Sequence, residues 1–137
     1  MKLVLDTNVL YAGLRSQYGA SFKLLEALRH GRIEVCVTAP LMFEYDDVLH
    51  RPTSLPHLTP ADVDDFLDWF ALISSHHNVY YLWRPYLPDP KDDMVLEAAM
   101  SSSADALVTF NAKDFKLAPG VGVRVMTPNQ ILMSLPP

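Results

Sequence analysis

The sequence predicts an α/β fold in which a mainly parallel central sheet of about five strands lies between layers of helices. Short apolar runs alternate with longer stretches whose apolar residues recur at helical spacing, which is the pattern of strands and crossover helices. The first run, residues 3–5, is unbroken and apolar, as expected of a strand buried on both faces of a parallel sheet. Asp6 follows it directly, at the end of a strand where open α/β sheets place their ligands.

Length and composition are those of one globular domain, residues 1–137. Half of the residues are hydrophobic and 20% are charged, which is enough for a substantial core. The single cysteine, Cys36, lies in an apolar run and is expected to be a small buried thiol. No stretch approaches the length of a membrane span or of a signal peptide's apolar core, so we expect a cytoplasmic protein with no membrane partner.

The five predicted strands are short runs of apolar or β-branched residues bounded by turn residues. They are residues 3–5, 33–37, 78–83, 106–110 and 123–126. Helices are predicted in the connections, with Gly31 as a stop signal and Thr-x-Pro or Thr-Pro as start signals. They are expected at residues 8–14, 20–30, 38–50, 59–73, 92–103 and 127–135, with loops at 51–60 and 84–91 and a turn at 111–115.

Each of the first four strands is followed by a candidate carboxylate. Asp6 ends the first strand, Glu44 lies in the helix after the second, Asp92 opens the helix after the third, and Asp114 follows the fourth. Because parallel strands end at the same edge of a sheet, these acids are expected to converge there. Each also has a purely structural interpretation: Asp6 as a helix cap, and the others as a helix-edge residue, an acidic helix start and a turn residue.

Helical phase separates the acids of the doublet at 92 and 93. Asp92 is in line with apolar residues that would face the sheet, whereas Asp93 is turned toward Glu97 and is expected nearer solvent. We therefore prefer Asp92 as the inward ligand and keep Asp93 as a supporting or substitute ligand. Asn111, one residue past the fourth strand, is as well placed as Asp114 to hydrogen-bond a carboxylate or a metal-bound water.

Several carboxylates brought together cannot all stay ionised without compensation, and a divalent cation resolves the conflict. Oxygen-only ligands favour Mg²⁺ or Mn²⁺ over Zn²⁺, and such an ion suits phosphodiester hydrolysis. The sequence contains no phosphate-binding GxxxxGK[ST] or GxGxxG loop and no GxSxG nucleophile elbow. The net charge of −5 argues against broad electrostatic binding of nucleic acid, but it does not exclude an enzyme that gathers acids around a metal.

The opening LVLDTNVL resembles the first motif of the PIN-domain family, with Asp6 as first acid and Thr7 and Asn8 as its companions. PLMFEYDDVLHRP is similar to the segment that holds the family's second acid, here Glu44. LPDPKDDMVLEAAM is similar to the third motif, in which the doublet allows either Asp92 or Asp93 to align.

LVTFNAKDF is similar to the fourth motif, with Thr109, Asn111 and Asp114 in the matching places. Together with the closing VRVMTPNQIL, the resemblance covers nearly the whole chain and points to VapC-like toxins of toxin–antitoxin systems. It implies a three-layer α/β/α ribonuclease whose four acids hold Mg²⁺ or Mn²⁺. It also implies an RNA substrate, a small antitoxin partner and a homodimer.

Two other hypotheses stay open. A catalytically silent binding module would keep the fold and act through protein partners. In either case Trp69 and Leu72 are candidates for a face toward another subunit or an antitoxin. A phosphatase of the haloacid-dehalogenase type also places an aspartate directly after the first strand. Those enzymes use a second aspartate two residues later, where this chain has Asn8.

Overall fold

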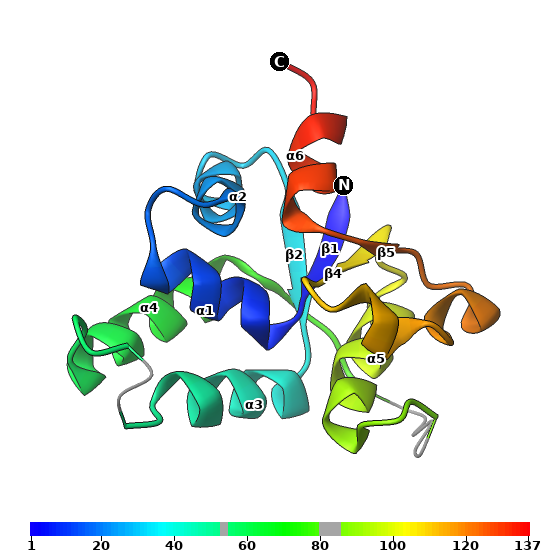
Figure 1. Ribbon diagram of the computed structural model, residues 1–137, viewed down its shortest axis with the longest axis horizontal. Coiled ribbons are helices and arrows are strands. Elements are labelled where there is room, and N and C mark those ends of the chain that lie inside the picture. The colour runs from blue at the N-terminus through cyan, green and yellow to red at the C-terminus, as the bar shows by residue number, and fades with distance from the viewer. Residues whose placement is uncertain (53–54, 80–85) are drawn as a thin grey trace.

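The computed structural model describes residues 1–52, 55–79 and 86–137, and its centre is a five-stranded, all-parallel sheet (Figure 1). The strand order is β3-β2-β1-β4-β5, so the first strand of the chain lies in the middle of the sheet. The strands are β1 (Lys2–Leu5), β2 (Glu34–Val37), β3 (Ser75–His76), β4 (Ala106–Val108) and β5 (Val125–Met126). The predicted α/β class with a parallel sheet is confirmed.

Helices cover both faces of this sheet. They are α1 (Thr7–Arg15), α2 (Ala20–Arg29), α3 (Ala39–Leu49), α4 (Pro60–Ile73), α5 (Pro90–Ser102) and α6 (Pro128–Ser134), with 3₁₀ turns η1 (Ala112–Phe115) and η2 (Ala118–Val121). Helix α5 packs on β1, β2 and β4, while α1, α2 and α6 contact one another in series on the other side of the strands. Helix α3 contacts α1, α4 and α5, so it links the two helical layers.

Strands β1 and β2 run downward in Figure 1, and the first turns of α1 and α3 lie below their ends. Three of the helix starts have the predicted caps. The side-chain oxygen of Thr38 accepts a hydrogen bond from the backbone N–H of Leu41 at 3.3 Å. Thr59 and Thr127 each form a reciprocal capping box with the residue three positions later.

Leu3, Val4 and Leu5 of the central strand β1 are all fully inaccessible to solvent, as predicted for a strand buried on both faces. Cys36 on the neighbouring strand is also buried and free, as predicted. Gly13 allows α1 and α2 to approach closely, because a Cβ at that position would lie 2.6 Å from Cδ1 of Leu25.

The prediction of a third strand at residues 78–83 was wrong in position. The observed β3 begins directly after α4, where Ser75 pairs with Cys36 and His76 with Val37, and residues 78–79 are not in a strand. Residues 80–83 lie outside the described part of the chain. A two-residue edge strand of polar side chains carries no apolar alternation, so the sequence pattern does not indicate it. None of the helices in the described ranges is long and apolar enough to cross a membrane.

Candidate active site

Asp6 is fixed at the junction of β1, β4 and α1. Its backbone N–H donates to the carbonyl oxygen of Val108 at 2.9 Å, which continues the pairing of β1 with β4. One carboxylate oxygen accepts the backbone N–H of Thr7 at 2.8 Å and the other accepts the hydroxyl of Thr109, also at 2.8 Å. Asp6 therefore does cap α1, as the structural interpretation holds, and it is also oriented by a side chain from a separate strand.

Thr109 is the centre of a small hydrogen-bond network behind Asp6. Its hydroxyl donates to Asp6 and accepts the side-chain amide of Asn8 at 3.4 Å and the backbone N–H of Asn111 at 3.0 Å. The side-chain oxygen of Asn8 in turn accepts the backbone N–H of Phe110 at 3.4 Å. The predicted supporting residues Thr7, Asn8, Thr109 and Asn111 thus all belong to the surroundings of Asp6, with Thr7 and Asn111 acting through the backbone.

The other predicted acids influence Asp6 through space. Burial raises the pKa of Asp6, the hydrogen bonds from Thr109 and Thr7 lower it, and the charges of Asp114 and Glu44 raise it further. Asp6 is 8% exposed, whereas Glu44 in α3 and Asp114 in η1 are partly exposed. Residues from β1, α3 and η1 therefore contribute to one acidic region at the carboxyl edge of the sheet.

Asp92, in the first turn of α5, is the most perturbed acid of this region. Burial, followed by the charges of Asp6, Asp89, Asp114 and Asp93, raises the pKa of Asp92 to about 7. Asp89 was not predicted as part of the site; it is the N-cap of α5 and accepts the backbone N–H of Lys91 at 3.0 Å. The named influences on Asp92 are burial and other carboxylates, which is the setting that a bound cation would relieve.

Asp93 has a different role, and its predicted position near solvent was wrong. It is fully buried, and its two oxygens accept the backbone N–H groups of Leu87 at 2.9 Å and Tyr86 at 3.3 Å. Helical phase misled here because α5 is covered on more than its apolar side: Glu97, which shares the side of Asp93, is only 1% exposed. Asp93 holds the segment that leads into α5, while Asp92 interacts with the other acids.

Tyr45 is a positioning residue that the sequence pattern did not identify. Its buried hydroxyl donates to the carbonyl oxygen of Leu5, the residue before Asp6. Its ring also meets that of Phe70 edge to face, with centroids 5.7 Å apart. Tyr45 therefore ties α3, with Glu44 beside it, to the end of β1. The one feature of the sequence that could have indicated this role is the hydroxyl of Tyr45 among the apolar residues of its helix that are buried.

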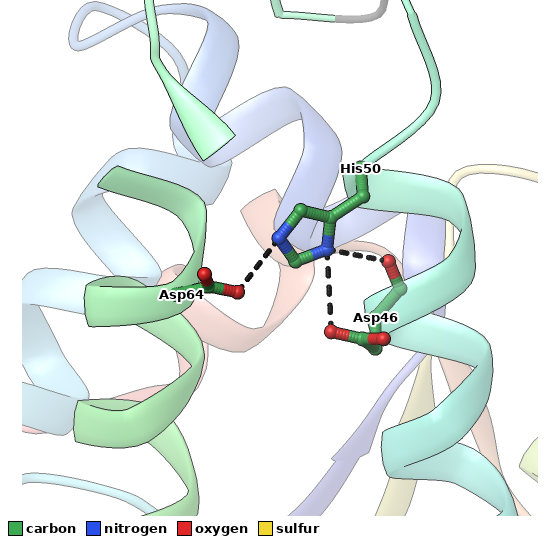
Figure 2. Close-up of side chains that lie close together, drawn as sticks. All are labelled: Asp46, His50 and Asp64. Carbon is green, nitrogen blue, oxygen red and sulfur yellow. Dashed lines mark hydrogen bonds and ion pairs between the residues drawn. The ribbon is translucent and has the colours of Figure 1, made fainter. Parts of the chain in front are cut away.

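A second polar cluster lies at the far end of α3, where His50 sits between two aspartates (Figure 2). Its Nδ1 is 3.2 Å from Asp46 and its Nε2 is 2.8 Å from Asp64 on α4. A hydrogen bond to the backbone oxygen of Asp46, together with both carboxylates, raises the pKa of His50 against a smaller opposing effect of burial. Both ring nitrogens already have carboxylate partners, so we interpret the cluster as an ion-pair connection between α3 and α4.

The two clusters differ in compactness. Within the described residues, Asp46, His50 and Asp64 are the one group whose metal-ligating atoms all lie within 4.8 Å of one another. The predicted acids Asp6, Glu44, Asp92 and Asp114 are coupled by charge but are not drawn together to that degree. Their donor chemistry still fits a hard divalent cation, because carboxylate oxygens are the ligands that Mg²⁺ and Mn²⁺ prefer.

A parallel α/β fold with acids at the carboxyl edge of its sheet defines a class of protein rather than one family. The family model of the PIN domain matches residues 2–113, and the chain therefore belongs to the PIN-domain family. No curated protein sequence matches the chain.

Solved structures share its fold at low sequence identity. VapBC2 from Rickettsia felis, bound to a DNA fragment from the promoter, matches with a TM-score of 0.66 and 16% identity over 93% of this chain and 98% of that one. FitAcB from Neisseria gonorrhoeae matches with a TM-score of 0.60 and 20% identity over 92% and 97%. A domain of a functionally unknown protein from Methanocaldococcus jannaschii matches with a TM-score of 0.53 and 15% identity over 92% and 89%.

Proposed function

We propose that this chain is a Mg²⁺- or Mn²⁺-dependent endoribonuclease that hydrolyses phosphodiester bonds of single-stranded or structured RNA. The observation that carries this proposal is the gathering of Asp6, Glu44, Asp92 and Asp114, from four separate segments of the chain, into one acidic region at the carboxyl edge of the sheet. In that region, burial and the neighbouring acids raise the pKa of Asp92 to about 7. A partly protonated acidic region costs stability in the absence of a cation, which is typical of a site built for a metal.

In this proposal Asp6, Glu44, Asp92 and Asp114 hold the metal. When bound, the metal supplies polarisation of the phosphodiester and a water of lowered pKa for the attack. Thr109 keeps the Asp6 carboxylate in one orientation through its 2.8 Å hydrogen bond, and the backbone N–H of Thr7 holds the other oxygen. Asp92 would have to give up its proton to hold a cation, so metal affinity would depend on pH.

We further propose that the chain is the toxin of a toxin–antitoxin pair and forms a homodimer. The PIN-domain family and the fold shared with the VapBC2 and FitAcB chains support this assignment. A small antitoxin protein would then be its second partner. Leu72, 83% exposed, and Ile73, 37% exposed, place apolar surface at the end of α4, where a protein contact is expected to lie.

The test is cleavage of a labelled single-stranded RNA by the purified chain with Mn²⁺, with Mg²⁺ and with EDTA. We expect cutting with either metal, none with EDTA, and loss of cutting in Asp6→Asn. Asp46→Asn is the matched control, because it removes a carboxylate from the second cluster and leaves the acids around Asp6 unchanged. Full activity of Asp6→Asn would refute the mechanism, and loss in Asp46→Asn alone would move the metal to the second cluster.

The alternative is a catalytically silent binding module. It is favoured by the spacing of the four acids, which do not form a compact group of ligand atoms, and by the net charge of −5. Calorimetric titration separates the two functions: Mn²⁺ binding that is lost in Asp92→Asn supports the enzyme, and no binding at millimolar Mn²⁺ supports the module.

A further inference from the structure

A groove of about 290 Å³ opens directly beside the acidic region, between α1 and α3. Thr7, Asn8 and Tyr11 of α1 form one wall, and Val48 of α3 with Arg51, two residues past the end of that helix, forms the other. Thr7 and Asn8 are the two residues that follow Asp6, and both take part in the hydrogen bonds around its carboxylate and Thr109. The groove therefore begins at the two residues that adjoin Asp6, next to the proposed site of hydrolysis.

The lining combines an aromatic ring, an aliphatic side chain and a guanidinium. Tyr11 and Val48 provide apolar surface, and both are partly buried. Nη2 of Arg51 lies 3.0 Å from Asp47, but the two side chains are 49% and 66% exposed. Because an exposed ion pair of this kind is weak, an incoming phosphate can compete for the guanidinium with little loss.

The segment just after α3, which carries Arg51, is held in place before any ligand arrives. The preceding residue, His50, connects α3 to Asp64 on α4, and the backbone N–H of Arg51 donates to the carbonyl oxygen of Val48 at 3.3 Å. The volume lies near the lower end of small-molecule pockets, about 300 Å³, which suits one nucleotide unit and not a large cofactor.

We infer that this groove is a subsite for one nucleotide of a single-stranded RNA, with its base against the ring of Tyr11 and a phosphate on Arg51. The inference rests on the proposed function, because a strand cut at the acids must continue across the adjoining surface. Stacking on an aromatic ring accepts every base, and an arginine beside it supplies the phosphate contact that the acids lack. A protein segment in the groove is the competing occupant, and the experiment separates it from RNA.

The experiment measures binding of a fluorescent single-stranded RNA of mixed sequence to the full chain by anisotropy, in EDTA so that no cleavage occurs. We expect Tyr11→Ala to weaken binding about fivefold to about a hundredfold, and Tyr11→Phe to bind as the unmodified chain does. Arg51→Gln should weaken binding and lower the slope of log affinity against log salt by about 0.7. Tyr18→Ala and Arg29→Gln are matched controls, since both residues are exposed and lie outside the groove.

Each outcome is decisive. RNA that is cut with Mn²⁺ and bound equally well by the Tyr11 and Arg51 variants would overturn the subsite and leave the ribonuclease standing. A chain that neither binds nor cuts RNA would overturn both. If Tyr11→Ala fails to fold by circular dichroism, Arg51→Gln decides alone. Unchanged RNA affinity with loss of a dimer in light scattering would assign the groove to a protein contact and overturn the inference.

Discussion

Asp92→Asn is expected to stabilise the metal-free protein while removing its activity. The change replaces an acid whose pKa is raised to about 7, first by burial and then by the other carboxylates, with an uncharged side chain of nearly the same shape. Between its ordinary pKa of 3.8 and the raised value, folded Asp92 keeps a proton that the unfolded chain has lost. The contribution of Asp92 to stability is thus fully present below pH 3.8 and is lost as the pH rises through about 7.

The size of the effect follows from the same shift. Raising the pKa from 3.8 to about 7 costs the ionised form at most about 4 kcal/mol. The side chain is partly exposed, so solvent screens part of this cost. We therefore expect the free energy of unfolding of Asp92→Asn to exceed that of the unmodified chain by about 1–3 kcal/mol at pH 8 and by close to zero at pH 4. Asp92→Asn should therefore unfold at higher urea concentration than the unmodified chain at pH 8, and at nearly the same concentration at pH 4.

The assay is urea unfolding in EDTA at the two pH values, repeated with Mn²⁺. Added Mn²⁺ should stabilise the unmodified chain and have a smaller effect on Asp92→Asn, which reverses their order. Asp93→Ala is a contrasting variant: it removes the buried acceptor of the Leu87 and Tyr86 N–H groups and should lower the free energy of unfolding by about 1–3 kcal/mol at pH 4, where folded Asp92 keeps its proton. The measured quantity is the difference in stability between Asp92→Asn and the unmodified chain at each pH. A difference that is no larger at pH 8 than at pH 4 would refute this account of the acidic region.

Three further substitutions test the supports of the site. Tyr45→Phe leaves the buried carbonyl oxygen of Leu5 without its hydroxyl partner and should cost about 1–2 kcal/mol in urea unfolding; an unchanged midpoint would contradict this. Thr109→Val should lower RNA cleavage, because it frees the Asp6 carboxylate, and should cost about 1–3 kcal/mol, because it leaves the buried partners of the hydroxyl unpaired. Thr109→Ser should restore both activity and stability, and equal activity of the two variants would argue against an orienting hydroxyl. The raised pKa of His50 contributes stability below pH 6.5, and this stability is lost as the pH rises through the pKa of the folded state. His50→Gln should therefore lower the free energy of unfolding by less than about 1 kcal/mol at pH 6 and by nothing measurable at pH 9. A cost that does not change with pH would show that packing, not charge, is lost.

The sequence by itself determined the features that depend on neighbouring residues. The unbroken apolar run of β1 indicates a strand buried on both faces, and it is fully buried. The caps at Thr38, Thr59 and Thr127 fix helix starts through contacts within four residues. The position of Asp6 at the end of β1 follows from the same local pattern, as does the alternation that specifies the fold class.

Tertiary structure decided which polar groups meet across the sheet and between helices. Helical phase could not show that Asp93 is buried, because the groups that cover it come from outside the helix. Leu87, in the segment before α5, donates its backbone N–H to Asp93, and the side of α5 that carries Asp93 is also buried. The hydroxyl of Tyr45 contacts Leu5, and His50 contacts Asp64. The partners are too far apart in the sequence for helical or strand periodicity to predict these contacts. The groove at Tyr11 exists only because α1 and α3 lie side by side. Backbone preferences and capping act within a few residues, whereas burial and charge depend on the whole fold, and these set the pKa of Asp92.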